Sequence, residues 1–202
     1  MLKILIATNN PHKAAELAQI LPRLTAGGRA IEYLSLADFP AVPAPEETGL
    51  TLEENALIKA KAGRAATGLI SIADDTGLLV DALDGAPGVH SGRYAYPDRT
   101  DYPANNEKLL KELKNISLEK RTARFKTVAA IILPDGQTAT TEGIVEGKIA
   151  AEYSGTNGFG YDPLFIVTSL GKTMAQLTME EKNKISHRAL AFARMAEIIK
   201  KL

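Results

Sequence analysis

Two adjacent carboxylates, Asp74 and Asp75, open the tetrapeptide Asp-Asp-Thr-Gly directly after the apolar segment 69–73. The segment predicts a buried strand that ends at the aspartates, which is where open α/β sheets bind ligands. Because successive strand residues point to opposite faces, one carboxylate should face a cleft and the other should bond to a neighbouring loop. Asp-Thr-Gly is also ordinary turn chemistry, so the motif alone leaves a catalytic and a structural interpretation open.

A second pair of carboxylates, Glu46 and Glu47, follows a proline-rich stretch between 39 and 45. Mg²⁺ takes one or two protein carboxylates and completes its shell with water and substrate phosphate oxygens. Either glutamate could therefore join an aspartate at a hard divalent cation, and the sequence does not decide between the two. Taken alone, a pair of surface charges would have the same sequence.

The segment Thr8-Asn9-Asn10-Pro11-His12-Lys13 lies where an apolar strand, 2–7, passes into a helix. Asn10 and Pro11 form an N-cap and first-turn pair. The positive end of a helix attracts anions, and Lys13 adds a charge there. The segment predicts a phosphate site that is not a Walker loop, although a capped helix with a solvated lysine has the same pattern.

A glycine-rich segment, 154–163, contains Phe159, Gly160, Tyr161 and Asp162. Glycines let a flat ring approach the backbone, and aromatic side chains can stack on that ring. The alternative is an ordinary turn with core aromatics.

Three cationic side chains, Lys182, His187 and Arg188, gather near the start of the last predicted helix. They offer several fixed hydrogen-bond donors. A lone histidine is usually structural, but its two cationic neighbours favour a polar ligand.

The first half of the chain reads as alternating strands and helices. Strands are expected at 2–7, 31–36 and 69–73, and the second intervening helix begins at a Thr51–Glu54 capping box and ends at Gly68. Two β-α-β passages indicate an α/β fold with a partly parallel sheet and helices on its faces.

The second half is richer in strands. A helix is expected at 103–115, strands at 121–133 and 137–150 flank an Asp135-Gly136 hairpin signal, and a further strand is expected at 164–167. A single last helix behind a second capping box, Thr178 with Glu181, carries an apolar stripe. Its members are Ile185, Ala189, Phe192, Ala196 and Ile199.

The composition excludes several classes of protein. In 202 residues, 24 Lys+Arg balance 24 Asp+Glu, so no net positive field draws the chain to nucleic acid or to an anionic membrane. The absence of cysteine excludes a thiolate nucleophile and fits a reducing compartment, of which the cytoplasm is the simplest. The longest apolar run, 128–133, is too short to span a bilayer, and we expect no targeting segment.

Six motifs together resemble, in type and order, the inosine-triphosphate pyrophosphatase family, whose members act on non-canonical purine nucleoside triphosphates. The resemblance extends from Lys3 to the terminal helix, and Thr76 keeps the hydroxyl where many members have serine. The motifs are Thr8-Asn9-Asn10-Pro11-His12-Lys13, Glu46-Glu47-Thr48-Gly49, Asp74-Asp75-Thr76-Gly77-Leu78, Gly85-Ala86-Pro87-Gly88, Phe159-Gly160-Tyr161-Asp162-Pro163 and Ser186-His187-Arg188.

The resemblance implies an elongated mixed β-sheet with flanking helices, forming one domain over 1–202 with two lobes around a central substrate cleft and no separate linker. It implies hydrolysis of ITP, dITP and XTP to the monophosphate and pyrophosphate. It further implies one or more Mg²⁺ per subunit, a homodimer, and a small-molecule nucleotide as the binding partner.

The resemblance also implies roles for individual residues. Glu46 and Asp75 would hold the metal, Asp75 would activate water, and the 8–13 segment with Lys59 would bind the phosphates. The remaining substrate residues would be Thr76, Phe159, Gly160, Tyr161, Asp162, Lys182, His187 and Arg188. Donors at His187 and Arg188 would suit the 6-keto oxygen of inosine and would be left unpaired opposite the 6-amino group of adenosine.

Two other functions remain open at this stage. A non-catalytic purine-nucleotide sensor would need the loop and the cationic cluster but no carboxylates at a metal, so Glu46 and Asp75 favour an enzyme. A phosphohydrolase that releases orthophosphate would differ in its product.

Overall fold

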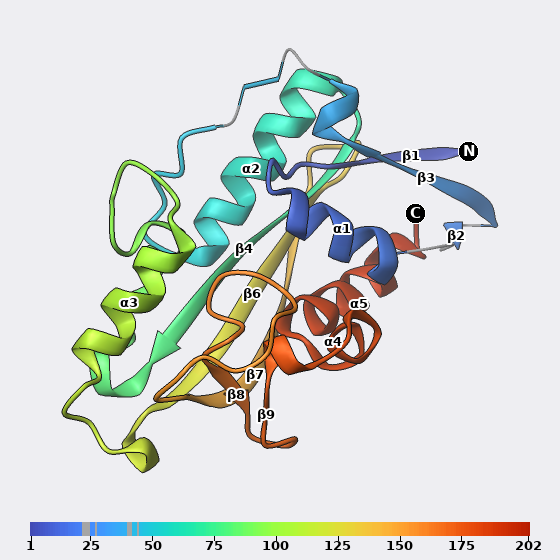
Figure 1. Ribbon diagram of the computed structural model, residues 1–202. Helices are drawn as coiled ribbons and strands as arrows, with labels where there is room; N and C mark the ends of the chain where they lie inside the picture. Colours follow the sequence, from blue (N-terminus) through green and yellow to red (C-terminus); the bar gives the residue numbers. More distant parts are fainter. Residues whose placement is uncertain (22–24, 27, 40–41, 44) are drawn as a thin grey trace. The chain divides into compact units, whose positions relative to one another are not determined.

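The computed structural model describes residues 1–21, 25–26, 28–39, 42–43 and 45–202, and within them the chain forms a mixed α/β fold (Figure 1). Part of the proline-rich stretch 39–45 lies outside the described residues. The helices are α1 (Pro11–Ile20), α2 (Leu52–Thr67), α3 (Tyr102–Glu112), α4 (Met179–Ile185) and α5 (His187–Ile199). The strands are β1 (Leu2–Ile6), β2 (Thr25–Ala26), β3 (Arg29–Ser35), β4 (Ile70–Val80), β5 (Pro87–Gly88), β6 (Thr122–Ile132), β7 (Thr138–Ile149), β8 (Phe165–Val167) and β9 (Lys172–Thr173).

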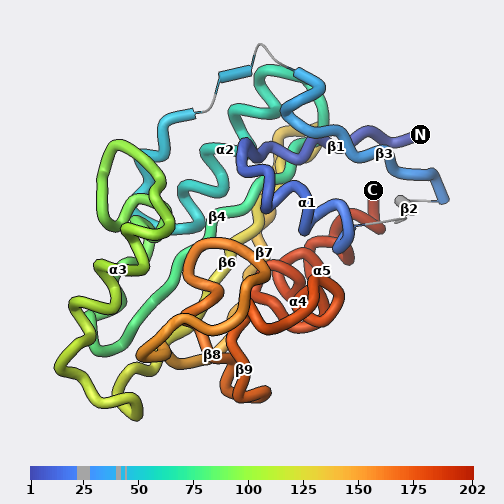
Figure 2. The backbone as a smooth tube through the Cα atoms, in the orientation of Figure 1, coloured from blue at the N-terminus to red at the C-terminus, as the bar shows by residue number. Residues whose placement is uncertain are grey.

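The described strands form one mixed sheet in the order β2-β3-β1-β4-β6-β7-β8-β9, and β5 pairs with β4. Strand β1 is parallel to both β3 and β4, with Leu5 opposite Leu34 on one side and Ser71 on the other. The connections through α1 and α2 are therefore the β-α-β passages that the sequence predicted. Strands β6 and β7 run side by side after the predicted hairpin turn, in which Gly136 has φ 86° (Figure 2).

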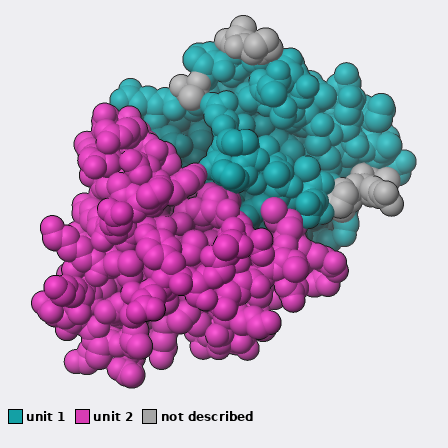
Figure 3. Space-filling view, viewed as in Figure 1, with its two compact units in different colours: residues 1–75, 127–143, 188–202 teal, residues 76–126, 144–187 magenta. Residues whose placement is uncertain are grey.

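The residues divide into two compact units, coloured teal and magenta in Figure 3. Unit 1 contains residues 1–75, 127–143 and 188–202, and unit 2 contains residues 76–126 and 144–187. Each unit has its own apolar core.

The core of unit 1 forms on both faces of its parallel strands. Ile4 and Ile6 of β1 pack in one cluster with Leu17 of α1 and Phe192 of α5. On the opposite face, α2 approaches so closely that a Cβ at Gly63 would lie 2.8 Å from Leu5. Alternate residues of β1 thus face different helices, as strand geometry requires.

The core of unit 2 gathers Leu78, Leu109, Phe125, Phe165 and other apolar side chains in one buried cluster. One polar group of this core pairs with backbone: the Tyr161 hydroxyl donates to the Ser91 carbonyl at 2.9 Å. Such pairing removes most of the cost of burying a hydroxyl.

Helix ends follow the predicted capping chemistry. The Asn10 side chain caps α1, Thr51 and Glu54 form a capping box at α2, and Gly68 ends α2 with φ 71°. The second capping box, of Thr178 with Glu181, begins α4. Each cap satisfies amide or carbonyl groups that a helix end leaves unpaired.

Strand β4 does not end at the aspartates, so the predicted strand end after residue 73 is wrong. The strand continues to Val80 because Leu78 and Val80 are completely buried and β5 pairs with Leu78 and Leu79. Core burial beyond the polar residues outweighs the turn preference of Asp-Thr-Gly.

The predicted single last helix is also wrong, because Ser186 separates α4 from α5 in an extended conformation, φ −65° and ψ 152°. Ile185 packs with the core of unit 2, whereas Phe192 and Ile199 are completely buried in unit 1. Because of this break, α4 packs on the core of unit 2 and α5 packs on the core of unit 1.

Candidate active site

The predicted phosphate segment connects β1 to α1, as expected. The Asn10 side-chain oxygen accepts from the amides of His12 and Lys13, at 2.9 and 3.3 Å, and the Thr8 hydroxyl accepts from the Asn10 amide. The first amides of α1 therefore have a protein partner. Anion binding at this segment would depend on Lys13, on the helix dipole and on the remaining loop donors.

Lys13 belongs to a buried group of four charged side chains in unit 1. Its ammonium lies 2.9 Å from the Asp74 carboxylate, which also accepts from the Arg188 guanidinium at 3.3 Å. Arg188 pairs in addition with Glu16 of α1. Two carboxylates and two cations thus neutralise one another in the interior, the condition under which buried charge is tolerated.

Charge pairing decides the protonation of Asp74. Burial by itself raises a carboxyl pKa, but Lys13 and Arg188 outweigh it and hold the pKa of Asp74 far below its ordinary value. Burial lowers the pKa of Lys13 more than Asp74 raises it. Asp74 is therefore a permanent anion, which suits a structural counter-charge better than a proton acceptor.

The neighbouring carboxylate, Asp75, has a different partner. Its Oδ1 lies 2.6 Å from the ammonium of Lys59 on α2, and the same ammonium lies 3.1 Å from Glu47 Oε1. One cation thus bridges a carboxylate of β4 and a carboxylate of the segment before α2. The alternation of the strand sends the two aspartates to separate cations.

Burial raises the pKa of Asp75, and the opposing effect of Lys59 and Lys13 does not cancel it. For Lys59, burial favours the neutral amine, but Asp75 and Glu47 raise its pKa overall. The pair therefore combines a charged lysine with a carboxylate that is more basic than an ordinary aspartate.

The chemistry of this donor set fits a hard divalent cation. Across the described residues no group of three or more His, Cys, Asp or Glu side chains is gathered for a metal. Asp75 and Glu47 nevertheless both contact the Lys59 ammonium, and two carboxylates are sufficient for Mg²⁺ when phosphate and water complete its shell. The glutamate that contacts Lys59 is Glu47; both glutamates are exposed residues, and the Glu47 side chain is 32% exposed.

A second polar cluster lies in unit 2 around Asp162. Its Oδ2 accepts from the Phe159 amide at 2.9 Å and from the Lys182 ammonium at 2.6 Å. The Lys182 nitrogen lies 5.1 Å from the centre of the half-buried Phe159 ring. Asp162 therefore holds the backbone of Phe159, whose partly open ring could stack on a planar base, and the buried Lys182 ammonium near that ring.

Helix α3 holds the same loop from a second direction. The Tyr102 ring centre lies 5.8 Å from that of Phe159, and the Asn106 amide donates to the Gly160 carbonyl at 2.9 Å. Gly158 must remain glycine, since its φ is +76° and a Cβ would collide with the Asp162 carboxylate. The sequence analysis missed Tyr102 and Asn106, because both occupy ordinary positions in a helix and no motif distinguishes them.

The remaining predicted site residues fall in different surroundings. His187 is buried in unit 2 and stacks on Phe125 at 4.6 Å, while Arg188 belongs to unit 1. Tyr161 is also buried, so only its neighbour Phe159 offers a partly open ring. Thr76 is the half-buried first residue of unit 2 in β4.

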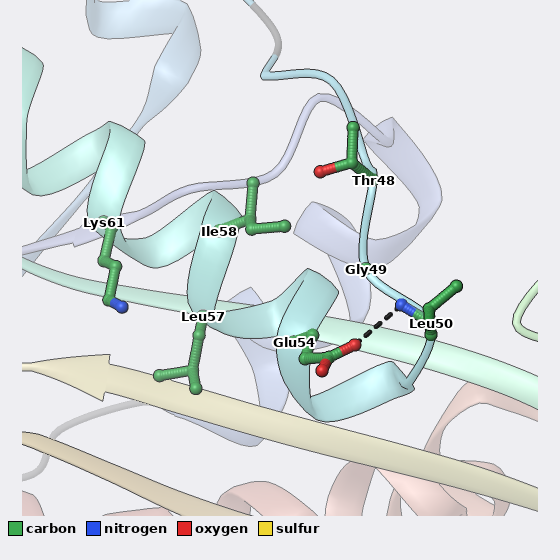
Figure 4. A pocket seen from close by; sticks show the side chains of 7 residues that line it. All are labelled: Thr48, Gly49, Leu50, Glu54, Leu57, Ile58 and Lys61. Atoms are coloured by element: carbon green, nitrogen blue, oxygen red, sulfur yellow. Dashed lines mark hydrogen bonds between the residues drawn. The ribbon is translucent and has the colours of Figure 1, made fainter.

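A pocket on unit 1 is formed by the start of α2 and the segment before it. Thr48, Leu50, Leu57, Ile58 and Lys61 line it together with Gly49 and Glu54, and Glu54 accepts from the Leu50 amide at 2.7 Å (Figure 4). None of Glu47, Lys59 and Asp75 contributes to its lining, so the candidate active site is defined by the charged side chains and not by this pocket.

Fold and charged groups define a class: a mixed α/β protein with paired carboxylates and cations suited to a phosphorylated ligand. The model of the Ham1 family matches residues 4–198. The dITP/XTP pyrophosphatase of Elusimicrobium minutum is 54% identical over 98% of this chain and 100% of its own length, and that of Bacillus subtilis is 49% identical over 98% of both. The solved HAM1 protein of Coxiella burnetii covers 100% of both chains at 39% identity with a TM-score of 0.87.

The chain belongs to the Ham1 family. The resemblance that the six motifs indicated is therefore confirmed, and so is the mixed α/β fold class. The helices of the described part include none long and apolar enough to cross a membrane.

Proposed function

We propose that the chain hydrolyses non-canonical purine nucleoside triphosphates, dITP, ITP and XTP, to the monophosphate and pyrophosphate. Relatives of nearly equal length carry the name dITP/XTP pyrophosphatase. The observation that carries the proposal is the Asp75–Lys59–Glu47 arrangement, in which a carboxylate of raised pKa stands beside a second carboxylate.

Asp75 and Glu47 would hold a divalent cation, for which we propose Mg²⁺. When bound, the cation neutralises phosphate charge and lowers the pKa of bound water. Asp75 would orient the attacking water and accept its proton, a role that its basicity supports. Glu46, the alternative carboxylate, lies next to Glu47 and is exposed.

Lys13 and the end of α1 would bind the phosphates, with Thr8 and Asn9 as further donors. Asp74 and Glu16 would keep Lys13 and Arg188 in place, since a buried carboxylate fixes the direction of the cation it pairs with. Phosphoanhydride cleavage depends mainly on such positioned charge.

The loop around Phe159 would bind the base. Phe159 supports stacking, and Lys182 supplies donor hydrogens that suit the 6-keto oxygen of hypoxanthine and xanthine. The 6-amino group of adenine would leave such donors unpaired. Because its guanidinium already pairs with Glu16 and Asp74, we assign Arg188 to holding Asp74 and not to reading the base.

We further propose that the protein acts as a homodimer in the cytoplasm. The balanced charge and lack of cysteine are compatible with that compartment.

The test is product identification from ITP with Mg²⁺. Equimolar monophosphate and pyrophosphate are expected from the purified chain. Orthophosphate release would identify a different phosphohydrolase, and tight nucleotide binding without turnover would identify a sensor.

A further inference from the structure

One ammonium group stands between the two carboxylates that the proposed function assigns to the metal. Lys59 Nζ lies 2.6 Å from Asp75 Oδ1 and 3.1 Å from Glu47 Oε1. The side chains of Lys59 and Asp75 are only 13% and 10% exposed, whereas that of Glu47 is 32% exposed. A monovalent cation carried by α2 therefore occupies the place where both carboxylates converge.

The Lys59 ammonium supplies to Asp75 and Glu47 the positive charge that a bound metal ion would otherwise supply. Two partly buried carboxylates repel each other, and a shared positive charge relieves that repulsion. A divalent ion that uses the same two oxygens must separate them from the ammonium, and the interaction of charges within 4 Å is strong near a protein interior. The ammonium is tethered, so it is present at every site regardless of the metal concentration.

We propose that Lys59 is a built-in competitor of the divalent cation, which binds to Asp75 and Glu47 only by displacing the Lys59 ammonium. The inference rests on the proposed function in one respect, the assignment of Asp75 and Glu47 to the metal. It gives Lys59 a role beyond phosphate binding. The chain without nucleotide binds divalent metal weakly, because the Lys59 ammonium competes for the two carboxylates.

The helix provides a matched control. Lys61 lies two residues further along α2, is exposed and lines the pocket of Figure 4, so it carries the same charge without touching Asp75 or Glu47. Lys59→Met and Lys61→Met remove the same charge from the same helix, and any difference between them comes from the contact with the carboxylates.

The experiment measures Mn²⁺ binding without nucleotide, from the electron paramagnetic resonance signal of free Mn²⁺, in parent, Lys59→Met, Lys61→Met and Lys59→Arg proteins. Circular dichroism melting checks that each variant is folded. Lys59→Met is expected to bind Mn²⁺ at least about tenfold more tightly than the parent, whereas Lys61→Met and the charge-preserving Lys59→Arg stay close to the parent. If Lys59→Met does not fold, Lys59→Gln removes the charge with a polar side chain and is expected to change the affinity in the same direction.

Equal or weaker Mn²⁺ binding in the folded, uncharged Lys59 variant would overturn the competitor role. The double variant Lys59→Met/Asp75→Asn separates that failure from a failure of the proposed function. It is expected to lose the gained affinity; if it retains tight Mn²⁺ binding, the metal binds elsewhere and the assignment of Asp75 is wrong.

Discussion

Asp74 and Asp75 are adjacent in β4, yet their carboxylates pair with cations from different helices, Lys13 at 2.9 Å and Lys59 at 2.6 Å. The alternation of the strand thus produces two environments from one dipeptide. Lys13 with Arg188 makes Asp74 a fixed anion, and burial makes Asp75 more basic. We therefore expect the same substitution to affect mainly turnover at Asp75 and mainly stability at Asp74.

Asp75→Asn should leave the fold intact and reduce turnover of ITP by at least about a hundredfold, because an amide neither accepts the proton of water nor holds a divalent cation firmly. Steady-state kcat with pyrophosphate detection gives the answer. A variant within about tenfold of the parent, roughly 1.4 kcal/mol of barrier, would show that Asp75 is not the central group.

Asp74→Asn should instead lower stability, by about 3–5 kcal/mol, because it leaves Lys13 and Arg188 buried without their shared counter-charge. Denaturant unfolding of parent and variant measures the difference. An unchanged midpoint would mean that the two cations find other partners.

The ion pairs of Asp74 also make the free energy of unfolding depend on pH. The folded pKa of Asp74 lies below its ordinary 3.8, so its contribution to the free energy of unfolding is complete above about pH 4 and is lost as the pH falls through the folded value. Acid titration of unfolding should therefore show a smaller loss in Asp74→Asn than in the parent. Parallel curves would contradict the pairing.

Lys13→Ala should weaken the binding of triphosphate more than that of monophosphate, because the missing charge faces the distal phosphates in the proposed role. Calorimetry with a non-hydrolysable ITP analogue and with IMP measures both affinities. Lys3→Ala is the control, since Lys3 is exposed and pairs only loosely, at 3.6 Å, with Glu32. Equal losses for both ligands would place Lys13 away from the phosphates.

The parent should prefer ITP and XTP over ATP by about tenfold to a hundredfold in kcat/KM, since leaving the Lys182 donors unpaired opposite the 6-amino group costs roughly 1–3 kcal/mol. Phe159→Ala should lower kcat/KM for ITP by about tenfold or more through lost stacking, worth roughly 1–3 kcal/mol. Comparable parent values for ITP and ATP would refute base recognition at this loop, whatever the product.

Local sequence predicted the capped ends of helices well, but it did not predict element ends that depend on packing in the folded chain. Asn10, the Thr51–Glu54 box and Gly68 act through neighbours a few residues away, so their roles are visible in the sequence. The continuation of β4 and the break at Ser186 depend on two cores that only the folded chain assembles.

The same distinction applies to the candidate site. The motifs marked the charged side chains, but they did not indicate which carboxylate pairs with which cation. The pairing of Arg188 with Glu16 joins residues 172 positions apart, and no local pattern marks Glu16 as its partner. Nor does the sequence show that the neighbours His187 and Arg188 belong to different units, with His187 stacked on Phe125.

Unit 1 consists of three separate segments of the sequence, and this affects how the chain can fold during translation. Its parts are 1–75, 127–143 and 188–202, so its last part is translated only after all of unit 2. Until then Glu16 and Asp74 lack Arg188, and the apolar face of α1 lacks Phe192. Unit 1 therefore cannot complete its fold until residues 188–202 have been translated. A nascent chain halted before α5 leaves Glu16 without Arg188, keeps only Lys13 as the partner of Asp74, and exposes an open apolar surface to chaperones.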